Sequence, residues 1–209
     1  AVLGTLILAF GWYGFNVGTA ASVFALEEGA LTLGAFSYVG RVAMTTTIAM
    51  ACGAIGAAAV AWAKTGKVDT LYVANGLLAG LVGITAIPDT TTWWGAFLVG
   101  GLAGAQLPIV FSLMENKLKI DDVCAVFPVH GSAGVLGTLM FPFVATPGTV
   151  GSIANAFVAQ LIGVVAIAAW TIAATALVWG VLKAIGEARV TPEHEQEGLD
   201  VSEHGGETY

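Results

Sequence analysis

His130 carries the side chain in this sequence that is best suited to moving a proton. No Asp, Glu, Lys or Arg occurs from Val123 to Leu182, so the imidazole lies within an uncharged stretch. Ionisable groups in apolar surroundings are costly and usually face a cavity or a partner. Neutral imidazole accepts a proton at one ring nitrogen and donates at the other, which suits a proton relay. The alternative is a buried structural histidine that is hydrogen-bonded to a backbone carbonyl.

Two neighbouring acids, Asp121 and Asp122, come just before that stretch. Acids in the first turn of a helix are stabilised by the helix dipole, so one interpretation is a cap at the membrane surface. The other is an interior acid that orders the start of the helix near a pathway. A metal site would need more ligands than these two acids and His130, so we expect no metal.

Three aromatic side chains lie close together near the start of the chain, within Gly11–Asn16. Trp12 and Phe15 are three residues apart, so on a helix they share one face. Aromatic faces attract cations and also form apolar gates. Packing in a core or against lipid would explain the same residues without any function.

The composition places these residues in a membrane. Hydrophobic residues make up 57% of the chain and charged residues 10%, and the mean hydropathy is +0.86. Soluble domains carry about 25% charged residues, so this chain cannot cover a water-exposed surface. Half of its 14 acids lie after residue 186, which argues against nucleic-acid binding and indicates an acidic tail.

Six apolar segments predict the membrane-crossing elements, since a span needs about 20 residues. The Ala145–Thr149 segment has turn residues and divides the long uncharged stretch into two spans. The sequence begins inside a hydrophobic run without a methionine, which suggests a piece of a longer chain. We therefore expect an all-α polytopic protein with a membrane domain (1–186), a tail (187–209) and helices over about 1–26, 40–63, 70–87, 92–114, 123–144 and 151–184.

The basic residues predict the orientation of these spans. With alternating helices, six of the seven fall on one side and only Arg41 on the other. Positive charge gathers on the cytoplasmic side of membrane proteins, so the carboxy terminus is predicted to be cytoplasmic. The six residues are Lys64, Lys67, Lys117, Lys119, Lys183 and Arg189.

Glycines recur at four-residue spacing in three of the predicted helices. The pairs are Gly14 and Gly18, Gly76 and Gly80, and Gly100 and Gly104. Small residues at this spacing let helix backbones approach closely in membranes, so they predict tight helix packing rather than a functional site.

Taken together, the motifs resemble those of the ammonium transporter (Amt/Mep/Rh) family. They occur in order over nearly the whole chain. They are Gly11–Asn16, Asn75–Val82, Lys119–Asp122, Val126–Gly131, Gly134–Gly137, Glu195–Asp200 and His204-Gly205.

The resemblance implies an ammonium-transporter fold of eleven helices, built from two inverted halves of five and a long final helix. Inverted repeats place the pathway at their interface. This chain would supply the second inverted repeat of five helices and the long final helix. The family forms trimers with one pore in each subunit, so we expect a homotrimer in the lipid bilayer of the cell membrane.

Particular residues match functional positions of the family. His130 matches the second of the twin pore histidines, and Phe15 matches one of the stacked phenylalanines above the pore. Trp12 matches a tryptophan that lines the central part of the path. Thr19 stands where many members have a serine at the outer cation site, and it keeps the hydroxyl.

Asp122 matches the acid at the start of the family's tenth helix, and with Asn75 it is expected to support the pore. Other positions depart from the pattern. Ala125 replaces a common aspartate and Pro128 a common glycine, which could bend the broken helix differently. The segment Ala86–Thr90 stands where a Pro-Ala-Cys-Gly stretch is usual.

The implied function is transport of ammonium or ammonia through a hydrophobic pore with a pore-lining histidine, without a cofactor and without enzymatic activity. A PII-type signalling protein would bind at the cytoplasmic face, where Gly198, Leu199 and Asp200 form the expected contact in the tail. One alternative is an ammonium sensor that signals through this tail. Another is a membrane-embedded hydrolase using Asp121, Asp122 and His130, which would need a metal and a water cavity.

Overall fold

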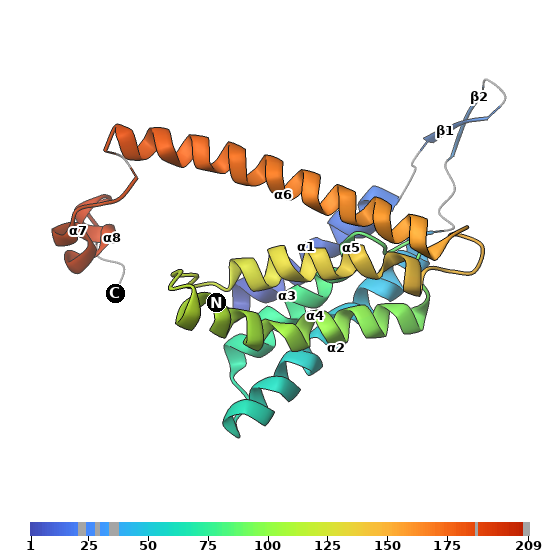
Figure 1. The fold of residues 1–209 in the computed structure, drawn as a ribbon, viewed down its shortest axis with the longest axis horizontal. Helices are drawn as coiled ribbons and strands as arrows, with labels where there is room; N and C mark the ends of the chain where they lie inside the picture. The colour runs from blue at the N-terminus through green and yellow to red at the C-terminus, as the bar shows by residue number, and fades with distance from the viewer. Residues whose placement is uncertain (21–23, 28–29, 34–37, 187, 207–209) are drawn as a thin grey trace. The chain divides into compact units, whose positions relative to one another are not determined.

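The computed structural model describes residues 1–20, 24–27, 30–33, 38–186 and 188–206 (Figure 1). It is mostly helical, as predicted. The chain divides into two compact units, Ala1–Ile162 and Gly163–Tyr209.

Helices make up most of the first unit. In chain order they are α1 (Val2–Ala20), α2 (Val39–Thr65), α3 (Thr70–Thr85), α4 (Trp93–Ser112), the π-helical segments η1 (Leu113–Lys117) and η2 (Phe127–Ser132), α5 (Ala133–Val144) and the start of α6 (Ile153–Ala184).

Five helical segments of the described residues are long and apolar enough to cross a membrane: α1, α2, α4 with η1, η2 with α5, and α6. The predicted span 70–87 corresponds to α3, which is apolar but has only 16 residues. Asp69 begins α3 by accepting hydrogen bonds from the backbone N–H groups of Leu71 and Tyr72, and this cap sets the start of the helix.

The first helix is shorter than predicted. It was expected over 1–26, but α1 ends at Ala20, and a hairpin follows, with β1 (Phe24–Glu27) antiparallel to β2 (Ala30–Leu33). An uninterrupted apolar run does not show by periodicity whether it continues as helix or turns into strand, which explains the error.

The helix expected over 123–144 also begins later than predicted, in η2. Ala125 has a left-handed backbone, with φ 56°, which a regular helix cannot contain. Pro128 follows in the first turn of η2, where its missing N–H costs least. The segment therefore starts as an irregular turn and a π-helix before it becomes α5.

Glycines bring the backbones of α2, α3 and α4 into direct contact, and these three helices pack against one another pairwise. A Cβ added at Gly80 or at Gly100 would meet the backbone of Ala49, and one added at Gly104 would meet the backbone of Gly53. The prediction of tight packing is thus confirmed for the second and third glycine pairs. Around the first pair, in α1, no described atom lies within 4 Å of an added Cβ.

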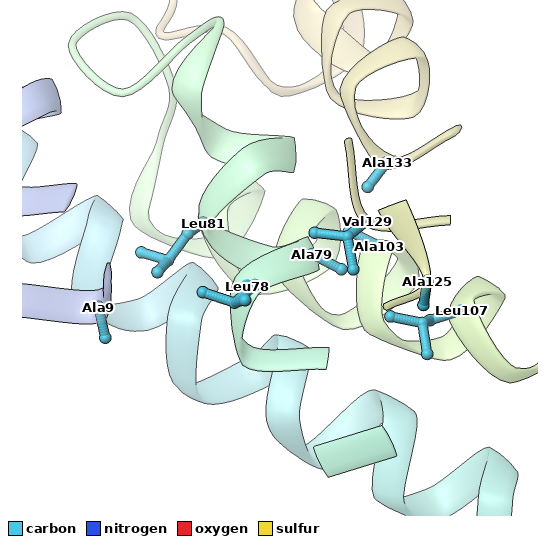
Figure 2. Packing of buried hydrophobic residues seen from close by; sticks show 9 residues of the cluster. All are labelled: Ala9, Leu78, Ala79, Leu81, Ala103, Leu107, Ala125, Val129 and Ala133. Carbon is cyan, nitrogen blue, oxygen red and sulfur yellow. The ribbon is translucent and has the colours of Figure 1, made fainter. Parts of the chain in front are cut away.

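An apolar core lies where α1, α3, α4 and the beginning of α5 meet. Small residues such as Ala79, Ala103 and Ala133 allow the helices to approach, and Leu81 and Leu107 fill the space between them (Figure 2). Val129, in η2, belongs to this core and is 2% exposed. His130 is the next residue in the chain, so it lies on a segment that is fixed by the packing of Val129 in the core.

The second unit ends in two short helices, α7 (Pro192–Glu197) and α8 (Leu199–Ser202). The side chain of Thr191 caps α7 by accepting from the backbone N–H of His194. His194 Nδ1 lies 3.0 Å from Glu203 Oε1, and this contact joins α7 to the residue after α8. The tail is thus folded within itself.

Candidate functional site

Trp12, Phe15 and His130 form one aromatic cluster. The ring of Trp12 lies 6.4 Å from the imidazole of His130, with an angle of 22° between the ring planes. Its centroid is 6.2 Å from that of Phe15. The structure therefore brings together three predicted pathway residues, two from α1 and one from η2.

A hydrogen bond to a side chain of α3 fixes the indole of Trp12. Trp12 Nε1 donates to Thr85 Oγ1 at 2.8 Å, and that hydroxyl donates to the carbonyl of Leu81 at 2.7 Å. The indole is consequently held against α3 while its ring face stacks on His130. Thr85 was not among the predicted residues, because a hydroxyl in an apolar helix can also bond to its own backbone without any further role.

The cluster lies on an open face of the first unit. Phe15 is 61% exposed, His130 is exposed and Trp12 is half-buried. Asn16 is the opposite case: it is 3% exposed, and its Nδ2 donates to Thr46 Oγ1 at 3.1 Å. One side of α1 is therefore anchored to α2, and the side with the aromatic rings is free for other contacts.

Asp122 caps the segment that carries His130. The carboxylate is 8% exposed, and its two oxygens accept hydrogen bonds from the backbone N–H groups of Val126, at 2.7 Å, and Phe127, at 2.9 Å. Asp121 is exposed. Asp122 combines features of the two interpretations, because it is a buried acid that caps this segment and so fixes the start of η2.

Gln106 holds the same segment from α4. Its Nε2 donates to the carbonyls of Ala103 and Pro128, both at 2.8 Å, and Ser132 Oγ lies 2.7 Å from its Oε1. One amide side chain thus contacts the backbone before His130, at Pro128, and the hydroxyl after it, at Ser132. Sequence reasoning missed Gln106, although it is the only amide in the apolar stretch of α4, and buried amides in membranes usually join helices.

A cavity of about 240 Å³ opens beyond Phe15. Thr19, one turn after Phe15, lies in its wall, and its hydroxyl donates to the Phe15 carbonyl at 2.5 Å. With that hydrogen committed, the oxygen lone pairs remain as acceptors. The lining residues are Phe15, Asn16, Thr19, Ala20, Thr85, Ala86, Pro88 and Asp89.

The remaining predicted residues lie elsewhere. Asn75 is half-buried on α3, ten residues before Thr85. In the tail, Gly198 ends α7 with φ 100°, and Leu199 and Asp200 begin α8. Within the described ranges, no group of three His, Cys, Asp or Glu side chains could hold a metal ion.

Comparison with known protein sequences gives consistent matches. The family model described as Ammonium Transporter Family matches residues 1–209. The chain is 64% identical to the ammonium transporter Amt2 of Haloferax mediterranei, over all of this chain and 46% of that protein. It is 40% identical to the ammonium transporter Amt1 of Methanocaldococcus jannaschii, over 97% of this chain and 48% of that protein. The chain thus spans about half the length of these relatives.

Solved structures of the same kind have the same fold. A structure of a "Sensor Amt Protein" matches with a TM-score of 0.85 and 32% identity, over 96% of this chain and 48% of that one. The crystal structure of Saccharomyces cerevisiae Mep2 matches with a TM-score of 0.75 and 28% identity, over 90% of this chain and 43% of that one. The family match over every residue and the agreement in fold lead to one conclusion: the chain belongs to the Ammonium Transporter Family, a family of multi-pass membrane transporters rather than enzymes.

Proposed function

We propose that this chain forms one wall of a pathway that carries ammonium, as ammonia, across the cell membrane. The observation that carries the proposal is the stack of Trp12 on His130 beside Phe15, on an open face that leads to the cavity at Thr19. The relatives named as ammonium transporters support the choice of substrate.

The physical basis is selection by deprotonation. Taking a bare cation into a low-dielectric pore costs several kcal/mol or more. Ammonium that transfers its proton to a water molecule of the outer cavity near Phe15 continues as neutral ammonia and avoids most of this cost, while the proton stays on the outer side. Potassium has no proton to release and is excluded. Beyond the phenyl ring, the imidazole of His130 accepts from or donates to the passing ammonia.

The open face of the cluster fits the expected partner half. The resemblance assigns the first pore histidine and the second gate phenylalanine to the other inverted repeat. The exposure of Phe15 and His130 would then be lost when that half packs against α1 and η2. We further propose a homotrimer, and a cytoplasmic tail whose Gly198–Asp200 turn is the contact for a PII-type signalling protein.

The test is uptake of radiolabelled methylammonium by the complete protein, in cells without their own ammonium transporter. Replacing His130 with alanine should lower uptake about tenfold or more, or abolish discrimination against potassium, because the group that hydrogen-bonds ammonia is lost. His204→Ala, an exposed histidine in the tail, is the matched control and should behave like wild type.

Two outcomes would contradict this mechanism. Wild-type uptake with an unchanged His130→Ala variant would remove the histidine from the pathway. A wild type that binds ammonium but moves none would favour the sensor alternative, in which the tail signals occupancy.

A further inference from the structure

Asp89 contributes a carboxylate to the wall of the cavity beyond Phe15. The cavity lies at the carboxyl ends of α1 and α3, on the side of the membrane predicted to be outer. Asp89 belongs to the segment Ala86–Thr90, where the sequence departs from the family's usual uncharged stretch. Asp89 has no role in the pathway proposed above.

The loop around Asp89 is firmly held by its neighbours. The hydroxyl of Thr45, on α2, donates to the carbonyl of Pro88 at 2.7 Å. On the other side, the backbone N–H of Thr146 donates to the carbonyl of Thr90 at 2.8 Å. Because both adjacent residues are bonded to other elements, the backbone of Asp89 has a fixed position at the cavity rim.

The hydroxyl groups of the cavity present acceptors rather than donors. The hydroxyl hydrogen of Thr19 is used on the carbonyl of Phe15, and that of Thr85 on the carbonyl of Leu81. One of the two N–H groups of the Asn16 amide is used on Thr46. A ligand with several N–H donors and a positive charge therefore matches this lining.

Among the described residues, the Asp89 carboxylate forms no direct ion pair with the predicted outer cation, Arg41. Arg41 directs its Nη2 to the carbonyl of Thr91 at 2.8 Å. Between residues that the structure describes, the one ion pair within 4.0 Å is His194 with Glu203, in the tail. The carboxylate is thus not held in a salt bridge, while the Arg41 guanidinium keeps its positive charge at Thr91, two residues further along the loop.

We propose that Asp89 binds small N–H cations, ammonium and methylammonium, at the outer cavity and sets the affinity of transport for them. The proposal rests on the transport function above and adds a residue that determines affinity. A volume of about 240 Å³ holds several waters at about 30 Å³ each. The cation therefore keeps part of its hydration while the carboxylate attracts it, before it reaches Phe15.

The experiment measures KM and the maximal rate of methylammonium uptake for the complete protein and its Asp89→Asn variant, at low and high ionic strength. We expect KM to rise about fivefold at low salt, the effect of one unit charge near contact distance in water, with the maximal rate retained. At high salt the difference should shrink, because mobile ions screen the carboxylate. Asp89→Glu keeps the charge and should stay close to the wild-type KM.

Glu115→Gln is the matched control. Glu115 is also exposed, but it lies in η1, beyond the far end of α4, about 30 Å from the loop that carries Asp89. Removing its charge should leave KM unchanged. An Asp89→Asn variant with wild-type KM, or with a KM increase that Glu115→Gln reproduces, would overturn the proposal. Absence of uptake by the wild type would instead overturn the proposed function itself.

Discussion

Single residues hold the candidate pathway in place from its buried side. Asp122 and Gln106 contact the backbone just before His130, and Thr85 contacts the indole of Trp12. None of these three needs to touch a substrate. They position the rings that we propose to line the pathway, so their loss should be visible first as loss of stability.

Replacing Asp122 with alanine should destabilise the complete protein by about 2–3 kcal/mol. The carboxylate is 8% exposed and accepts from two backbone N–H groups at the start of η2, which would be left without partners. Thermal unfolding in detergent measures the change. Asp121→Ala, at the exposed neighbour, should stay within about 0.5 kcal/mol of wild type. Equal losses for the two variants would contradict the cap.

At the residue scale, the sequence identified the side chains that could act on a substrate, but not all of the residues that hold these side chains in place. His130, Trp12 and Phe15 stood out because a lone imidazole and clustered aromatics are rare in an uncharged stretch. Gln106 and Thr85 did not stand out, because their value depends on which helix they face. The left-handed backbone of Ala125 was also unpredictable, since alanine ordinarily favours the helix that it interrupts here.

At the scale of elements, the glycine spacing correctly predicted close packing for the pairs in α3 and α4, but not for the pair in α1. Gly100 and Gly101 are adjacent on α4, yet only a Cβ at Gly100 would meet another backbone, that of Ala49. The helix rotation decides between them. Rotation depends on the partner helices, which a single sequence does not specify.

This pair provides a matched test of the packing. Gly100→Ala should destabilise the complete protein by about 1–3 kcal/mol, because the methyl group has no room beside α2. Gly101→Ala meets nothing within 4 Å and should be neutral or stabilising by up to about 1 kcal/mol, since alanine favours the helix. Thermal unfolding of the two variants side by side measures both. If Gly101→Ala were the more damaging, the rotation of α4 described above would be wrong.

At the scale of the whole molecule, the orientation in the membrane is still a prediction from the basic residues. It places the turn before α6 outside and the tail inside. Nothing in the packing of either unit depends on this sidedness. It therefore has to be measured in a membrane.

Cysteine labelling in intact cells tests the orientation, after Cys52 and Cys124 are replaced with alanine. A membrane-impermeant maleimide should label Thr149→Cys, in the exposed turn before α6, without cell lysis. Glu193→Cys, in α7, should be labelled only after lysis, because the tail is predicted to be cytoplasmic. The reverse pattern would invert the topology and place the Asp89 cavity inside the cell.

The backbone contacts among α2, α3 and α4 have a mechanical consequence. Sliding one helix along another would drive backbone atoms at Gly80, Gly100 and Gly104 into their neighbours, so this part of the molecule moves as a single rigid body. Rocking of packed elements takes microseconds to milliseconds, whereas a side chain that is free to turn changes rotamer in picoseconds to nanoseconds. In the proposed pathway, such a rigid wall would stay in place during transport, and the hop of each molecule rather than a conformational cycle would set the rate of passage.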